Sequence, residues 1–155
     1  MDSKLLDIDI DIDKIIMTDN THTKSSWGMV LKWHKTPPDY MIGRNPEVEL
    51  IYQNALLSRT RENYIHHIKT NVMESKTIQL AINSFPYYLA DEIQHYCLWI
   101  DNPDIIIDDT LIQLSIFDKL GKWLIPGIDV SWFINLRKNK SIPEIQHAHV
   151  FIRMA

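Results

Sequence analysis

The stretch that decides the fold is His147-Ala148-His149-Val150-Phe151-Ile152-Arg153-Met154, close to the end of the chain. Side chains of a β-strand alternate between two faces. One face would therefore carry His147, His149, Phe151 and Arg153, and the other Ala148, Val150, Ile152 and Met154. The second face is wholly apolar and is expected to pack on the core. The first collects two imidazoles and a guanidinium, groups suited to binding an anionic, phosphorylated ligand.

Three earlier segments also have the composition of strands. They are residues 78–82, residues 92–100 and residues 130–135, which are rich in aromatic and branched apolar side chains. Turn-forming residues stand between them, including Asn83-Ser84 and Pro126-Gly127. Together with residues 147–154 they predict an antiparallel sheet.

Helix signals dominate the N-terminal half. Ser26 can cap a helix that carries apolar residues from Trp27 to Leu31, and Asn45 followed by Pro46 can begin a second. Residues 59–74 and 108–124 are also predicted to be helical. Within the third helix, His66 and His67 point about 100° apart and are expected at the surface. The chain is thus predicted to be α+β, with N-terminal helices packed on an antiparallel sheet.

Composition excludes several functional classes. The chain has 155 residues and a formal charge of −4, and residues 1–20 hold six Asp against two Lys, which leaves the remainder balanced at 14 against 14. General nucleic-acid binding is therefore not expected. The sequence shows no apolar run of the roughly 20 residues that a membrane helix needs. The acidic start and the single Cys97 favour a cytoplasmic protein without internal disulfides. We expect residues 1–24 to form an acidic arm or edge strand, and residues 25–155 one globular domain.

The candidate site combines two strands. If the strands that carry His95 and the His147–His149 pair share a sheet and a face, the three imidazoles converge. Asn135, Ser141 and Arg153 would then hold phosphate oxygens beside them. One mechanism uses an imidazole as nucleophile or general base. A second uses His95, His147 and His149 as zinc ligands with an open fourth position. A third interpretation assigns the pair no chemistry, as the polar face of a half-exposed strand.

Seven short motifs in order carry a family resemblance. They are Ser26-Trp27, Arg44-x-Pro46, Asn83-x-Phe85-Pro86-Tyr87, His95-x-x-Leu98-Trp99, Trp132-Phe133-x-Asn135, Ser141-Ile142-Pro143 and His147-x-His149-Val150. Over residues 25–153 the chain resembles the N-acetylglucosamine-induced protein family, a domain of unknown function found in fungi and large DNA viruses. That resemblance implies no particular reaction.

The chain is more remotely similar to histidine-triad nucleotide hydrolases, which carry a His-x-His-x-His strand at the end of a small α+β domain. The likeness implies a histidine-triad-like fold, with His149 as the nucleophile and His147 and His95 as its partners. Asn135 and Ser141 would match the polar residues that contact phosphate. Phe151 departs from this pattern, because it stands where the third histidine would be and carries no imidazole.

The leading functional hypothesis is a phosphoester or phosphoanhydride hydrolase or transferase that acts on a nucleotide or sugar nucleotide. His149, His147 and His95 would be catalytic and Arg153, Asn135 and Ser141 would bind the ligand, with Tyr87 and Trp99 as pocket walls. No cofactor is expected, with zinc as the alternative. A non-catalytic module that binds a phosphorylated ligand or a protein is the second hypothesis, and the zinc enzyme is the third. The expected partner is a phosphorylated small molecule, with a second copy of the chain as a further partner.

Overall fold

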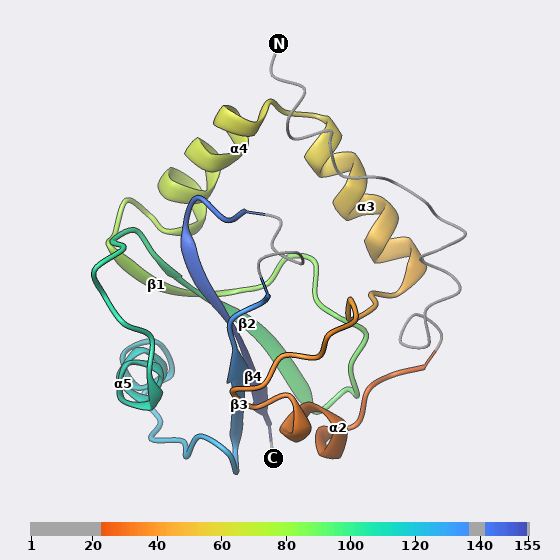
Figure 1. Cartoon of the computed structure of the whole chain (residues 1–155), viewed down its shortest axis with the longest axis vertical. Helices are drawn as coiled ribbons and strands as arrows, with labels where there is room; N and C mark the ends of the chain where they lie inside the picture. The colour runs from red at the N-terminus through yellow and green to blue at the C-terminus, as the bar shows by residue number, and fades with distance from the viewer. Residues whose placement is uncertain (1–22, 137–141, 155) are drawn as a thin grey trace.

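The computed structural model describes residues 23–136 and 142–154, and its centre is a four-stranded antiparallel sheet. The strands are β1 (Ile78–Ile82), β2 (Ile93–Ile100), β3 (Val130–Phe133) and β4 (Gln146–Arg153), in the order β1-β2-β4-β3. The predicted strand that carries the histidine pair is therefore central, between β2 and β3 (Figure 1). The α+β prediction is confirmed.

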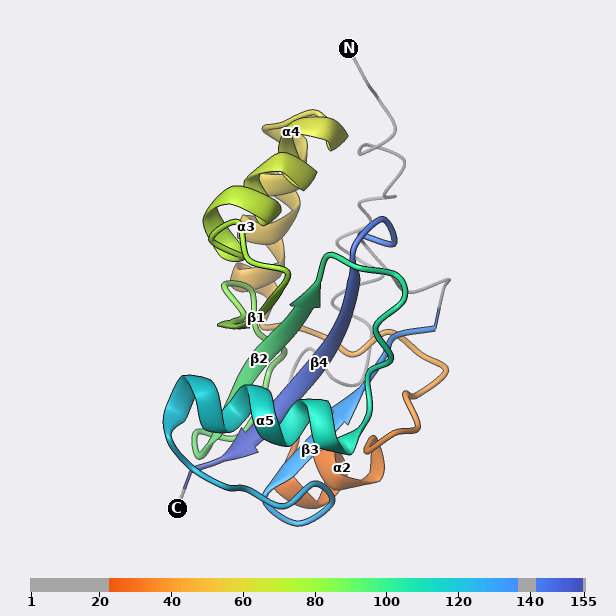
Figure 2. The same cartoon turned by 90° about the vertical axis from the view of Figure 1, so that its left-hand side faces the viewer.

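Helices lie on both sides of the sheet (Figures 1 and 2). The helical segments are α2 (Trp27–Lys32), α3 (Pro46–Leu57), α4 (Arg61–His67), the π-helix η3 (Ile68–Val72) and α5 (Asp109–Leu120). Side-chain caps begin four of them, with Ser26, Asn45, Thr60 and Asp108 each accepting a hydrogen bond from a backbone N–H of the first turn. The sequence identified two of these caps, Ser26 and Asn45.

Several predicted boundaries are wrong. The helix expected over residues 59–74 is divided into α4 and η3, because the hydrogen bonding changes to the wider π pattern at Ile68. The helix expected to reach residue 124 ends at Leu120, where Gly121 takes the left-handed conformation with φ 67°. The strand expected over residues 130–135 ends at Phe133. The acidic segment before residue 23 lies outside the described residues.

The two faces of the sheet pack differently. Ala148, Val150 and Ile152 face α5 and join a buried apolar cluster with Ile112 and Ile116. The opposite face is covered by two further clusters. One gathers α3, α4 and η3 around Cys97 and Trp99, and the other packs α2 against Phe133 and Phe151. The alternation predicted for β4 is thus confirmed, and the histidines belong to the face under α3 and α4.

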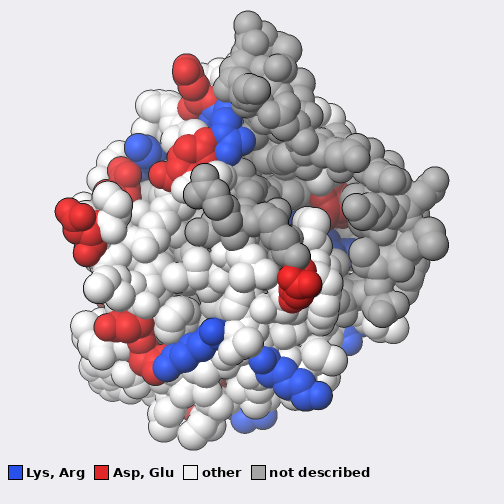
Figure 3. All heavy atoms as spheres, viewed as in Figure 1, with Lys and Arg blue, Asp and Glu red and all other residues white. Residues whose placement is uncertain are grey.

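On the face that Figure 3 shows, the Lys and Arg of the described part of the chain lie between Asp and Glu, and neither sign of charge dominates among them. The described residues on that face form no broad basic area of the kind that binds nucleic acid. Among the described residues, no helix has both the length and the apolar character needed to span a membrane.

Candidate functional site

The register of the sheet brings two of the predicted histidines together. His149 of β4 lies opposite Cys97 of β2, and His95 lies opposite Phe151, so the two histidines are diagonal neighbours on one face. Nε2 of His95 is 2.8 Å from Nδ1 of His149, and the two residues are only 3% and 5% exposed. Of the three imidazoles predicted to converge, His95 and His149 are thus in direct contact, and the ring of His147 lies 5.7 Å from that of His149.

A backbone amide determines where the protons of this pair lie. The N–H of Tyr87 donates to Nδ1 of His95 over 3.1 Å, so Nδ1 carries no hydrogen. Burial, and then the charge of Arg44, hold the pKa of His95 well below its usual range, so its ring is neutral and its one proton is on Nε2. Nε2 therefore donates to Nδ1 of His149.

His149 accepts this hydrogen bond at Nδ1 and is therefore a hydrogen-bond donor at Nε2. Burial, followed by the nearby His95, His147 and Arg44, holds its pKa well below the usual range, so the neutral ring carries its proton on Nε2. The side-chain amide of Asn135 lies 3.0 Å from Nε2 and the hydroxyl of Tyr87 lies 3.5 Å from it. This proton placement requires the amide oxygen of Asn135, rather than its nitrogen, to face Nε2. A protonated Nε2 has no lone pair, which opposes the predicted role of His149 as nucleophile.

His147 has the opposite arrangement. Its Nδ1 is 3.0 Å from the carbonyl oxygen of Ile145, which can only accept, so Nδ1 carries the proton. In the neutral ring Nε2 then holds a lone pair. The ring is stacked on Trp99 with centroids 4.5 Å apart, and His147 is 7% exposed. His147, rather than His149, thus has the proton placement of a base or nucleophile.

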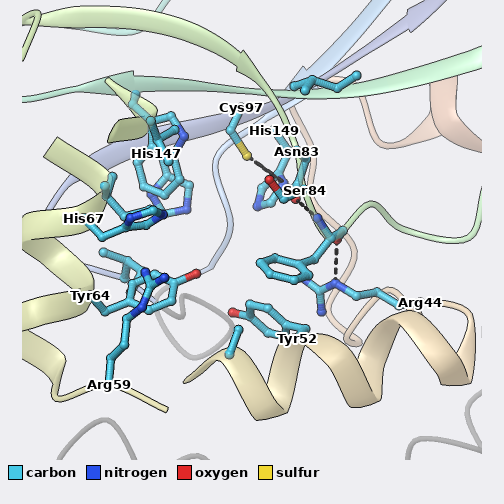
Figure 4. A pocket seen from close by; sticks show the side chains of 17 residues that line it. Arg44, Tyr52, Arg59, Tyr64, His67, Asn83, Ser84, Cys97, His147 and His149 are labelled. Carbon is cyan, nitrogen blue, oxygen red and sulfur yellow. Dashed lines mark hydrogen bonds between the residues drawn. The ribbon is translucent and has the colours of Figure 1, made fainter. Parts of the chain in front are cut away.

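These two histidines line a cavity of about 160 Å³ beneath α3, α4 and η3. Figure 4 shows Arg59, Tyr64 and His67 on one side of it and Arg44 on the other. A smaller recess of about 40 Å³ has Arg44, His147 and His149 in its lining as well, together with Tyr87 and Asn135. No described residue that lines either space is an Asp or a Glu.

The two arginines of the cavity differ in their charge balance. Arg44 is buried, and its guanidinium is 3.0 Å from Glu49, which also accepts from Gln53 over 2.7 Å. Burial alone lowers the pKa of Arg44, but Tyr52, Tyr87 and Glu49 outweigh it and raise the pKa. Arg59 lies over the ring of Tyr64 at 5.8 Å, and no carboxylate among the described residues forms a salt bridge with it.

Arg44 also supports the histidine pair mechanically. Its Nε donates to the carbonyl of Phe85 over 2.7 Å, and its guanidinium lies over the rings of Tyr52 and Tyr87 at 4.2 and 5.3 Å. The ring of Tyr87 in turn stacks on His149 with centroids 5.2 Å apart. Arg44 therefore anchors the segment whose backbone N–H sets the protons of His95.

The remaining predicted site residues are distributed unevenly. Trp99 lines the cavity and Tyr87 lines the recess, the places expected of pocket walls. Asn135, which was expected to hold phosphate oxygens, also lines the recess. Arg153 does not join them, which corrects its expected place beside the histidines: it is exposed, lies opposite Ile93 at the far end of β4, and stacks over Trp27 at 5.5 Å. It lies four positions along the strand from His149, a distance of about 13 Å. Ser141 lies outside the described residues.

Sequence reasoning missed Arg44, Arg59 and His67 as site residues. His67 was expected at the surface, yet it lines the cavity, and burial followed by the charge of Arg59 lowers its pKa. Its neighbour His66 is exposed, as predicted. The helical period around Tyr64, which lines the same wall, was the one signal that could have placed His67 inward.

A metal fits the cluster poorly. One candidate ligand atom from each of His95, Cys97 and His149 lies within 4.8 Å of the others, and His147 is not part of this group. Two nitrogens bound to tetrahedral zinc would be roughly 3.3 Å apart, whereas these form a 2.8 Å hydrogen bond. The N–H of Tyr87 also keeps the proton of His95 on the nitrogen that a metal would need. Burial raises the pKa of the Cys97 thiol to about 12, which further opposes metal binding.

The comparisons with known proteins bear on the fold and the family. The crystal structure of a protein called HTC1 matches 84% of this chain and 86% of its own at a TM-score of 0.55 and 16% identity. That likeness supports the fold alone. No curated protein matches the chain. The resemblances to the N-acetylglucosamine-induced and histidine-triad families stay predictions. A family model matches residues 13–153, and the chain therefore belongs to the DUF3605 family, described as a protein of unknown function.

Proposed function

We propose that this protein cleaves a small phosphorylated substrate by hydrolysis, with His147 as general base. The observation that carries the proposal is the opposite proton placement of two histidines that line the same cavity. The neutral ring of His147 has its lone pair at Nε2, whereas His149 has its N–H at Nε2. A base and a neutral hydrogen-bond donor side by side can activate a nucleophile and stabilise developing negative charge.

The charge of the cavity favours an anionic ligand. Arg44 already has Glu49 as its counterion, so Arg59 is the arginine whose charge the described lining leaves uncompensated. A guanidinium suits a phosphate because its planar N–H groups match two phosphate oxygens at once. The phosphorylated class expected from the sequence is therefore kept, but the anion-binding role passes from Arg153 to Arg59.

The proposed step uses a water in the recess. Its volume of about 40 Å³ exceeds the roughly 10–15 Å³ that one water requires. His147 Nε2 takes a proton from this water as its oxygen bonds to phosphorus. The bond from phosphorus to the leaving oxygen breaks, and that oxygen receives the proton from His147. The N–H of His149 stabilises the charge on the phosphoryl oxygens meanwhile. The imidazole ends in its starting state, so no further reactant is needed.

The test replaces His147 and His149 with Asn or Gln, whose amide nitrogens lie near the positions of Nδ1 and Nε2 of histidine, respectively. In His147→Asn the amide nitrogen replaces Nδ1 and can still donate to Ile145, but the base is lost. Turnover of 4-nitrophenyl phosphate is expected to fall about 10²- to 10⁴-fold. His149→Gln retains a donor near the position of Nε2, whereas His149→Asn does not, so His149→Gln should be the more active of the two.

Binding of inorganic phosphate, followed by ³¹P NMR, separates function from folding. Arg59→Gln should weaken that binding, whereas His147→Asn should leave it intact. A covalent phosphohistidine trapped by mass spectrometry would contradict the water route. If the wild-type protein binds phosphate but turns over neither 4-nitrophenyl phosphate nor pyrophosphate, the hydrolase proposal is overturned. The protein would then be a non-catalytic module that binds a phosphorylated ligand.

A further inference from the structure

The cavity beneath α3 and α4 is small. Sites for drug-sized ligands occupy roughly 300–1,000 Å³, whereas this cavity measures about 160 Å³. An engineered protein cavity of about 150 Å³ accepts one benzene molecule. The space beneath α3 and α4 is thus sufficient for about one ring, and a nucleotide would leave its base or its sugar outside.

The described lining also offers few open aromatic faces and few uncommitted amide groups that could hold a nucleobase. One face of Trp99 is covered by the ring of His147, and one face of Tyr52 is covered by the guanidinium of Arg44 at 4.2 Å. The ring of Phe85 is tilted against Tyr52, and the side chain of Asn83 is already hydrogen-bonded to Phe85 and Cys97. An aliphatic part of the wall comes from Ala55, Ile68, Val72, Ile82 and Ile142. Such side chains pack against the face of a single ring without providing the paired donors and acceptors that would identify a base.

We infer that the substrate class of this site is a phosphate monoester carried on one ring, either a monosaccharide or an aryl ring. This inference rests on the proposed function, because it places the phosphate with Arg59 and the histidines. The ring occupies the aliphatic part of the cavity, where Ala55 of α3 and Val72 of η3 both contribute to the wall. The inference therefore replaces the nucleotide or sugar nucleotide expected from the sequence with a smaller substrate, a single ring that carries one phosphate.

The first experiment measures dissociation constants by calorimetry for inorganic phosphate, ribose 5-phosphate and AMP. AMP differs from ribose 5-phosphate only by its base. Ribose 5-phosphate should bind about tenfold more tightly than phosphate, because the ring buries apolar surface. AMP should bind within about threefold of ribose 5-phosphate. An AMP affinity more than about tenfold higher would overturn the inference and leave the proposed function standing. Failure of all three to bind would instead overturn the proposed function.

A second set of ligands distinguishes the two sources of the ring. Phenyl phosphate and glucose 6-phosphate carry the same monoester on an aromatic and a sugar ring. Tighter binding of one identifies the source, while binding of both no tighter than inorganic phosphate would overturn the inference.

Ala55→Phe fills the cavity from α3, at a half-buried position whose side chain lines it. This variant should lose the ring contribution and bind ribose 5-phosphate no more tightly than phosphate. Leu57→Phe is the matched control, because Leu57 lies on the same helix, is 45% exposed and does not line the cavity. Equal ribose 5-phosphate binding by the two variants and the wild type would contradict the placement of the ring.

Discussion

The two faces of strand β4 are both buried, but they differ in the side chains that they bury. On the face toward α5, Ala148, Val150 and Ile152 are fully buried among apolar side chains. On the other face, His147 and His149 are almost as deeply buried, but each has a polar partner and borders a cavity. Burial alone therefore does not separate the two faces. The difference is that the histidine face buries polar groups, which need hydrogen-bond partners, whereas the α5 face buries apolar side chains only.

The largest effect on stability is expected at the polar support of the histidine face. Arg44→Gln leaves Glu49 buried without its charge partner, which should lower the free energy of unfolding by about 3–5 kcal/mol in urea denaturation. The double variant with Glu49→Gln removes both charges and should recover much of that loss. If Arg44→Gln costs less than about 1 kcal/mol, the histidine face does not depend on this ion pair.

The next largest effect is a pH dependence of folding stability, which is expected from the histidine face and not from the α5 face. In the unfolded chain His95 and His149 take up protons as the pH falls through about 6.5. In the folded chain burial holds their pKa values well below that range. Their contribution to stability is therefore fully present above about pH 7, and falls below about pH 6.5 by up to about 1.4 kcal/mol per pH unit for each histidine.

Chemical denaturation across this pH range tests the expectation. His149→Phe should flatten the pH dependence, whereas His66→Gln, at an exposed position, should leave it unchanged. Val150→Ala on the α5 face should lower stability by a similar amount at every pH. A pH dependence that persists in a His95→Phe/His149→Phe double variant would assign it to other groups.

The smallest effect is expected at the far end of β4. Arg153 is exposed and stacks on Trp27, an interaction worth about 0.5–1 kcal/mol. Arg153→Gln should therefore cost less than about 1 kcal/mol of stability. It should leave phosphate binding unchanged, in contrast to Arg59→Gln. Loss of phosphate binding in Arg153→Gln would return this residue to the site.

The sequence predicted the features that depend on neighbours along the chain. The Ser26 and Asn45 caps act within a few residues, and the two faces of β4 follow from the alternation of side chains. The antiparallel sheet and the α+β fold class were likewise predicted from strand composition and from the turn residues between the strands. The change to a π-helix at Ile68 left no comparable signal, because the segment keeps helical composition.

The site was predictable only in part, because its decisive contacts are remote in sequence. The histidine pair was visible, but Arg44 reaches it through the carbonyl of Phe85, which is 41 residues away. The proton positions depend on partners that no motif identifies, since a carbonyl faces one histidine and an amide faces the other. The histidine-triad resemblance therefore implied His149 as nucleophile, whereas these hydrogen-bond partners favour His147 as base.

The hydrogen bond from Tyr87 to His95 has a consequence for how this site can vary. Its donor is a main-chain N–H, which every amino acid except proline provides. Replacing the Tyr87 side chain can remove the ring that stacks on His149, yet leaves that donor in place. The backbone therefore determines that His95 donates to His149 and not the reverse. The same direction can persist in relatives that have another side chain at this position.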